Sequence, residues 1–467
     1  MEPLNGNNLG TSSKNKSIGK RYILTGVIIL LSAFSFGLVG ALQYTSPGLF
    51  KNVLSFEKVR PLHVSSAVFW ILLAACGSVT HYLAEVKGKL WSVRLSNVQW
   101  YLFTGSIILI LLSYLFGIFG GREYWEFHPL LAGPIILAWL FFIINVFKSI
   151  GSFRNQPVYV WMWMTGVVFF LFTFLESYLW LIPSFRSDVV KDMTIQWKSY
   201  GSMVGGWNML IYGCSIYLMD KISGSQKYSY SKIAFTLYFL GLFNLMFNWG
   251  HHIYTLPAPK LIQYISYGVS MTELLLLGRI IYFWRSSVNT LKKNYHILPY
   301  RFLFAADLWI FLTLLLAIVM SIPAINIYTH GTHITVAHTM GATIGINSFL
   351  LLSFTFDIFN IHQQKVVRQI SLGLYLSLAS LFIFWLSLII AGVLRADWQM
   401  HSSTVPFSVM MLSLRPYFIV FLISGVALFT GFFIIIFSLL RYHLSQKSVD
   451  KTLTLKKIKT APNVLHN

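Results

Sequence analysis

Histidines placed within long apolar stretches are the side chains of this sequence most suited to chemistry. His63, the adjacent pair His251 and His252, and His338 lie in three such stretches. Ligand-forming side chains are costly inside a bilayer, so they are functional candidates by default. A single buried histidine is more often a hydrogen-bonded core residue, but four at one depth on three segments favour metal binding. Imidazole suits iron, copper and zinc, and composition leaves the choice among them open.

Met340 follows His338 by two residues. Residues two apart on a helix point to roughly opposite faces, so the two side chains are expected to bind different centres. Histidine and methionine are both axial heme ligands. A His63 and Met340 pair would saturate one heme for electron transfer, and His338 would leave a second heme with a position open to a small gas. The pair His251 and His252 would supply part of a third centre facing that position.

Membrane-spanning helices must position these residues. The chain has 467 residues, of which 56% are hydrophobic and 10% charged, whereas soluble domains carry about 25% charged residues. Because a span takes roughly 20 apolar residues, we predict an all-α polytopic membrane protein with about twelve transmembrane helices. The expected spans are 22–44, 62–84, 99–119, 128–147, 158–183, 197–219, 233–256, 261–284, 302–326, 333–357, 369–394 and 416–440.

The distribution of charge predicts the orientation of these spans. The formal net charge is +21, and with this topology most Lys and Arg residues fall on the side of the amino terminus. The positive-inside rule then places both termini in the cytoplasm. We expect a cytoplasmic tail over 1–21, a heme-binding membrane domain over 22–440 and a basic cytoplasmic tail over 441–467. That tail indicates contact with anionic membrane lipid or a solvated end, and no nucleic-acid partner is expected.

Several motifs carry a resemblance to a known family. They are "VRPLHVSS" with Arg60 and His63, "GGREYWEF" at 120–127, "WGHHIYTLPAP" with the histidine pair, Glu273, and "THGTHITVAHTM" at 329–340. The sequence resembles the heme-copper oxidase superfamily, specifically the catalytic large subunit of the bacterial nitric oxide reductases, over essentially the whole chain. The resemblance implies a heme-copper oxidase-like bundle in the bacterial inner (cytoplasmic) membrane.

The resemblance also implies roles for individual residues. It makes His63 a ligand of a low-spin heme b, with Arg60 among the heme-binding residues, and His338 the proximal ligand of a high-spin heme b. It makes His251 and His252 ligands of a non-heme iron, or of copper. In the family, carboxylates matching Glu123 and Glu126 are associated with a calcium ion and with proton delivery from the outer side.

This sequence departs from the family pattern at three places. Met340 stands where the family has a histidine, which implies a His/Met heme with a raised reduction potential. Ungapped alignment of the sixth span places Tyr200 at the family's first iron ligand, and Val204 and Asn208 where the family has glutamates. A metal held by His251 and His252 would then need Tyr200, Asn208, Glu273 or water to complete its coordination.

Reduction of nitric oxide to nitrous oxide is the function that the resemblance implies. Glu273, Tyr200 and Asn208 are the candidate catalytic residues, and a cytochrome c-type or cupredoxin-type subunit is the expected electron donor. Three alternatives stay open: nitric oxide dismutation, an oxidase-like reduction of oxygen, and a non-catalytic heme-binding subunit that lacks the non-heme metal. A transporter would leave the clustered histidines unexplained. The inner-half acids Glu85, Asp307 and Asp357 are few and widely separated, so the sequence leaves open whether protons also enter from the cytoplasm.

Overall fold

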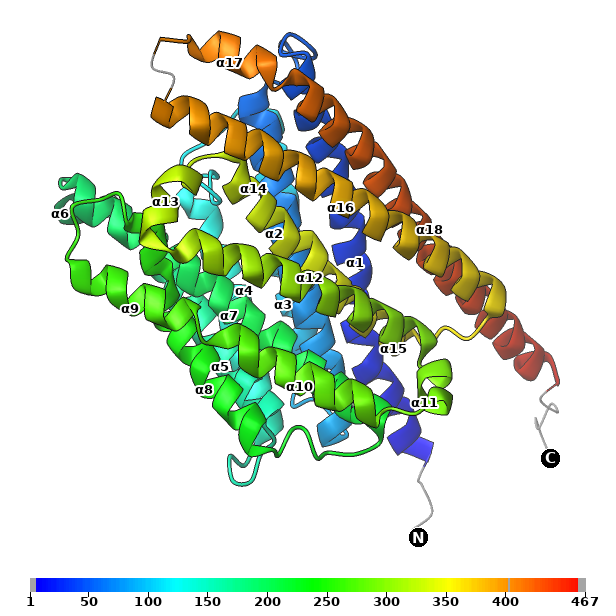
Figure 1. The fold of residues 1–467 in the computed structure, drawn as a ribbon. Helices are drawn as coiled ribbons and strands as arrows, with labels where there is room; N and C mark the ends of the chain where they lie inside the picture. Colours follow the sequence, from blue (N-terminus) through cyan, green and yellow to red (C-terminus); the bar gives the residue numbers. More distant parts are fainter. Residues whose placement is uncertain (1–5, 402–403, 461–467) are drawn as a thin grey trace, which may run out of the picture.

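Long α-helices make up this protein in a computed structural model that describes residues 6–401 and 404–460 (Figure 1). The side chains of residues 6–16, 273, 275, 276, 287 and 449–460 are outside that description. Over the described ranges there is no β-strand, and one isolated bridge joins Arg122 to Trp125. The predicted all-α polytopic fold is confirmed.

The longer elements follow one another along the chain as a series of helices. They are α1 (Gly6–Thr45), α2 (Phe56–Lys87), α3 (Val93–Leu115), α4 (Ala132–Ile150), α5 (Val158–Glu176), α7 (Val189–Ser223), α8 (Lys232–Phe247), α10 (Glu273–Ser287), α12 (Ile297–Ser321), α15 (Phe349–Phe359), α16 (Gln364–His401) and α18 (Arg415–Thr460). Shorter helices connect them: η1 (Pro129–Leu131), η2 (Leu179–Leu181), α6 (Pro183–Arg186), η3 (Asn248–Ile253), α9 (Lys260–Ser270), α11 (Thr290–Tyr295), α13 (Pro323–Thr329), α14 (His333–Met340), η4 (Gly341–Ser348) and α17 (Phe407–Ser413).

Ten helices among the described residues are long and apolar enough to cross a membrane. The predicted span 197–219 lies within α7, which has 35 residues but is less apolar than those ten. The predicted span 261–284 is wrong as a single helix, because α9 ends at Ser270 and α10 begins at Glu273. At this break the Thr272 hydroxyl donates to the Val269 carbonyl at 2.8 Å, closing a local turn between the two helices.

The candidate ligands lie on the most buried elements of the bundle. Helix α2 and the continuous segment α14–η4–α15 are mostly buried, whereas α16 and α18 pack against each other along one side (Figure 1). The Trp70 indole N–H of α2 donates to the Ser348 hydroxyl of η4 at 3.0 Å, which joins the two central segments. The η4 segment is a π-helix, a form found mostly as short insertions at functional sites.

Helix α1 begins and helix α18 ends at the same end of the bundle (Figure 1). Helix α1 begins at Gly6 and α18 continues through Thr460, so these two helices extend into the predicted tails 1–21 and 441–467. Residues 1–5 and 461–467 of the predicted tails lie outside the described ranges. The multi-span membrane character is clear from the helices, while the cytoplasmic orientation stays a prediction.

Candidate functional site

One cavity of about 370 Å³ brings most of the predicted site residues together. His63 of α2, His251 and His252 of η3, and His338 and Met340 of α14 all line it, as do Tyr200, Val204 and Asn208 of α7. Its walls are mainly apolar, with leucine, isoleucine and tryptophan side chains between the polar ones. Such a cavity with a few convergent polar groups is typical of a cofactor or ligand site.

His63 is held by the first helix. Its Nδ1 lies 2.7 Å from the Ala33 carbonyl oxygen, so Nδ1 carries the proton and donates. A Cβ added at Gly37 would lie 2.8 Å from two atoms of the same imidazole ring, so only glycine permits this close packing. Metal-binding histidines usually donate their second ring N–H to such a partner, which leaves the other nitrogen as the ligand. His63 therefore has the arrangement of a pre-oriented ligand through Nε2.

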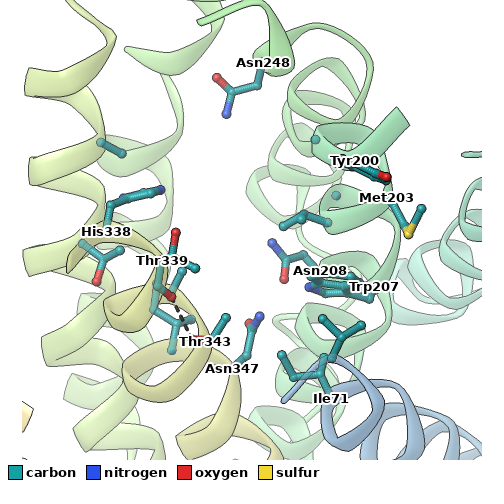
Figure 2. A pocket seen from close by; sticks show the side chains of 18 of the residues that line it. Ile71, Tyr200, Met203, Trp207, Asn208, Asn248, His338, Thr339, Thr343 and Asn347 are labelled. Carbon is teal, nitrogen blue, oxygen red and sulfur yellow. Dashed lines mark hydrogen bonds between the residues drawn. The ribbon is translucent and has the colours of Figure 1, made fainter. Parts of the chain in front are cut away.

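His338 and Met340 approach the cavity from the end of α14, directly before the π-helix η4. Figure 2 shows the His338 imidazole pointing into the cavity, with Asn208 extended toward it from the opposite wall. The Thr343 hydroxyl donates to the Thr339 backbone carbonyl at 2.8 Å. This hydroxyl group is therefore already hydrogen-bonded to the preceding turn of the same helical segment. The two side chains that were predicted to serve different centres thus share one cavity.

The adjacent pair His251 and His252 lies on η3, a short 3₁₀-helix that continues α8. Their ring centroids are 4.2 Å apart, and the His252 ring stacks on Trp197 of α7 at 4.9 Å and 9°. His251 Nδ1 is 3.2 Å from Asn248 Oδ1. The Asn326 amide of α13 donates to the His251 carbonyl at 3.3 Å. Contacts from three elements therefore orient the pair.

Helix α7 approaches this pair closely but brings no histidine to it. A Cβ at Gly201 would lie 2.7 Å from Trp249 Cβ, so the glycine permits the contact between α7 and η3. The Tyr200 ring packs edge-on against Tyr124 at 5.2 Å. Figure 2 shows the Tyr200 hydroxyl pointing away from His338. Tyr200 thus lines the cavity with its ring, while its hydroxyl lies on the side of the 119–128 loop.

The donor set fits two hemes better than it fits the third metal. His63, Met340 and His338 are axial ligands of the kinds that hemes take. Six polar atoms of the described cavity-lining residues are buried without a hydrogen-bond partner, as expected where a further group belongs: Trp125 Nε1, Trp207 Nε1, Asn208 Oδ1, Asn244 Nδ2, Thr313 Oγ1 and His338 Nδ1. Within residues 6–401 and 404–460, however, no three His, Cys, Asp or Glu side chains that the structure describes form a metal-binding group. A non-heme metal in this cavity would thus have two imidazoles, His251 and His252, and the unpartnered amide oxygen of Asn208 on the cavity wall as candidate donors.

Glu273 begins α10, but its side chain is outside the described residues. Its predicted role in proton supply therefore stays a prediction.

The predicted calcium ligands form an ion-pair cluster with Arg60 instead. The Arg60 guanidinium pairs with Glu123 and, at 3.3 Å, with Glu126. Burial raises the pKa of Glu126, partly offset by backbone N–H groups and by Arg60, and burial raises the pKa of Tyr124 to about 12. Glu126 Oε2 is the one buried oxygen of the two carboxylates without a partner. Calcium takes six to eight oxygen ligands, so these residues alone do not fit it.

Several residues that shape the site were not predicted. They are Ala33 and Gly37 behind His63, and Trp197, Asn248 and Asn326 around the histidine pair. Asn248, three residues before His251, was within reach of sequence reasoning, because residues three apart are neighbours on a helix. The others lie on different elements, and no local pattern indicates them.

The fold and the cavity define a polytopic helical membrane protein built around a buried, histidine-lined cofactor site. Residues 17–427 match the family described as Cytochrome C and Quinol oxidase polypeptide I. The chain belongs to this family, whose heme-copper members are oxidoreductases. The resemblance to the heme-copper oxidase superfamily is thereby confirmed.

Individual relatives include both reductases of nitric oxide and oxidases. The chain is 23% identical over 368 residues to a nitric oxide reductase subunit of Stutzerimonas stutzeri, covering 73% of this chain and 74% of that one. It is 21% identical over 430 residues to a cytochrome c oxidase subunit 1 homolog of Agrobacterium tumefaciens (strain T37), covering 85% and 78%. The cryo-EM structure of a heme-copper terminal oxidase dimer superposes with a TM-score of 0.71 at 15% identity, covering 91% of this chain and 83% of that chain. That likeness bears on the fold alone.

Proposed function

We propose that this chain reduces two nitric oxide molecules to nitrous oxide and water, with two electrons and two protons. The observation that carries the proposal is the convergence of His63, His338 and the pair His251 and His252 on one apolar cavity. Similarity to a nitric oxide reductase subunit supports the choice of substrate. The coarser assignment, to heme-copper oxidoreductases, does not depend on that choice.

In this proposal, different residues bind three metal centres. His63 and Met340 would hold a low-spin heme b, His338 a high-spin heme b, and His251 with His252 a non-heme iron or copper. When bound, these groups relay electrons and bind a small gas. The chain itself orients His63 through Ala33 and orients the histidine pair through Trp197, Asn248 and Asn326. Holding two gas molecules together in a small apolar space makes bond formation a matter of proximity.

We place the chain in the bacterial inner membrane with both termini cytoplasmic, because the basic residues concentrate on that side. Electrons would come from a cytochrome c-type or cupredoxin-type donor on the outer side. A charged cluster lies near the cavity and consists of Arg60, Glu123 and Glu126. Tyr124, which follows Glu123 in the chain, contacts the cavity residue Tyr200 with its ring.

Anaerobic membranes that contain the chain, supplied with ¹⁵N-labelled nitric oxide and a reductant, test the proposal. Headspace mass spectrometry should show labelled nitrous oxide, and His251→Ala should abolish it. His333→Gln is the matched control: His333 lies on α14 like His338, but packs against Tyr44 and Phe418 and does not line the cavity.

Two other outcomes contradict nitric oxide reduction. Labelled dinitrogen with oxygen indicates dismutation, a reaction compatible with the substituted α7 wall. Absence of any gas product while both heme spectra are intact indicates a heme-binding protein without a working third metal.

A further inference from the structure

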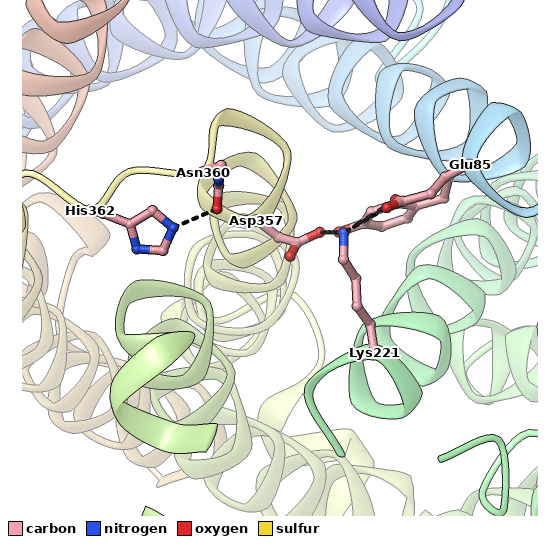
Figure 3. A network of polar contacts seen from close by, with 6 residues as sticks. Glu85, Lys221, Asp357, Asn360 and His362 are labelled. Atoms are coloured by element: carbon pink, nitrogen blue, oxygen red, sulfur yellow. Dashed lines mark hydrogen bonds and ion pairs between the residues drawn. The ribbon is translucent and has the colours of Figure 1, made fainter. Parts of the chain in front are cut away.

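A second group of charged residues lies at the end of the bundle where α1 begins and α18 ends. Lys221 of α7 donates to both oxygens of Glu85 of α2, at 3.1 and 3.2 Å, and to Asp357 Oδ2 of α15 at 2.8 Å (Figure 3). The Tyr82 hydroxyl donates to the same Asp357 oxygen at 3.1 Å. The expectation that these acids are widely separated is wrong for Glu85 and Asp357, because Lys221 binds both carboxylates.

Glu85 and Lys221 are partly exposed, whereas Asp357 is buried. The exposed fractions are 27% for Glu85, 28% for Lys221 and 4% for Asp357. Two carboxylates face one ammonium, so full ionisation leaves one negative charge in the cluster that a proton can neutralise. His296, at the start of α12, lies within electrostatic range of Asp357 and Lys221. The cluster thus connects the surface at this end to a buried carboxyl group.

One buried hydroxyl without a partner lies on α2 between Tyr82 and the cavity. Ser78 is one helical turn before Tyr82 on α2, is 0% exposed, and its hydroxyl has no hydrogen-bond partner. A buried hydroxyl without a partner marks a place where an ordered water belongs. Ile71, two turns further along α2, already lines the cavity. On the neighbouring segment, Asn347 lines the cavity about 15 Å from Asp357 at 1.5 Å per residue.

We propose that Glu85, Lys221, Asp357 and Tyr82 form a proton uptake site that supplies the cavity from the side of the chain termini. Intramembrane acid, base and hydroxyl groups in series are the usual material of proton relays. Protons would pass from Glu85 and Lys221 to Asp357 and Tyr82, and then through water near Ser78. The inference rests on the proposed function insofar as reduction at the cavity consumes protons.

The test uses the full chain with its hemes in liposomes that contain a trapped pH dye. A charged, membrane-impermeant reductant, hexaammineruthenium(II), is added outside, so only molecules with their electron-accepting face outward are reduced. Heme reduction without nitric oxide should make the lumen alkaline, because the electron added to a buried heme is compensated by a proton that binds to a nearby titratable group. Asp357→Asn should slow this lumen response about a hundredfold, the usual scale for loss of a proton-transferring group, and Asp357→Glu should restore it.

Glu176→Gln is the matched control. Glu176 of α5 pairs with Lys198 of α7, with exposed fractions of 11% and 38%, but lies at the opposite end of α7. It should leave the lumen response unchanged. If Asp357→Asn keeps the normal lumen response, or if the external medium alone becomes alkaline in the wild type, the proposal is overturned and the cluster only fastens α2, α7 and α15 together.

The heme spectrum reports whether a variant folds, and Lys221→Met provides a second variant if Asp357→Asn does not. Lys221→Met should also slow the lumen response while retaining both hemes. The proton measurement needs no nitric oxide. A failure to form nitrous oxide therefore contradicts the proposed function alone, and the lumen response still decides whether the cluster takes up protons.

Discussion

The imidazole of His63 and the backbone carbonyl of Ala33 are joined by a 2.7 Å hydrogen bond between α2 and α1. A backbone acceptor on a packed helix sets both the ring orientation and the position of the ring proton. Nε2, the nitrogen proposed as the heme ligand, is therefore oriented by a contact with the first helix, in the way that the second ring N–H usually orients a metal-binding histidine.

The contact between Gly37 and His63 predicts a selective loss of heme. In Gly37→Ala the new Cβ would lie 2.8 Å from the imidazole, which must shift at a cost of about 1–3 kcal/mol. We expect the low-spin heme spectrum to weaken while the high-spin heme stays. Gly40→Ala, on the same helix, should retain both hemes, because its Cβ would meet Val59 at an ordinary 3.5 Å. Equal spectra for the two variants would show that α1 does not position His63.

Met340 as an axial ligand predicts a change in reduction potential. Replacement of a methionine ligand by histidine lowers the potential of a heme. Met340→His should therefore lower the midpoint potential of the low-spin heme in an optical redox titration, and Met340→Leu should remove its low-spin spectrum. A spectrum and potential unchanged in both variants would mean that the methionine only lines the cavity.

Val204 offers a way to complete the third metal site. It lines the cavity on α7 and is 38% exposed, so a longer side chain has room. Val204→Glu should increase retention of non-heme iron during treatment with a chelator, by about tenfold or more. Metal analysis per heme provides the measurement, and Val204→Gln, similar in shape but neutral, should show no such gain. A gain in the glutamine variant would point to altered packing instead of a new ligand.

Glu126 predicts a pH dependence of stability. Burial raises its folded-state pKa above the ordinary value, so the folded chain binds more protons than the unfolded chain between those two values. The free energy of unfolding should then fall as the pH rises through that window, and its full contribution is present only below the ordinary pKa. Thermal unfolding in detergent across mildly acidic pH should show this slope. Glu126→Gln should flatten it, whereas Glu57→Gln, at the exposed start of α2, should not.

The sequence predicted the structure best where the signal is local or compositional. Apolar segments of span length indicated the helices, and His63, His251, His252 and His338 were found because polar residues are rare in such segments. It failed at 261–284, where hydropathy does not reveal the break between α9 and α10. It also did not show how Tyr200 is turned, because spacing along α7 gives the face of a side chain only approximately.

By itself, the sequence determined that this is a helical membrane protein with four histidines at similar depth, since composition and spacing follow from the order of residues alone. The tertiary structure decided which distant groups meet. Arg60 pairs with Glu123 and Glu126, and Lys221 joins Glu85 to Asp357 across 136 residues on either side. Such contacts depend on the helix packing of the whole bundle, which brings together side chains that no local pattern relates.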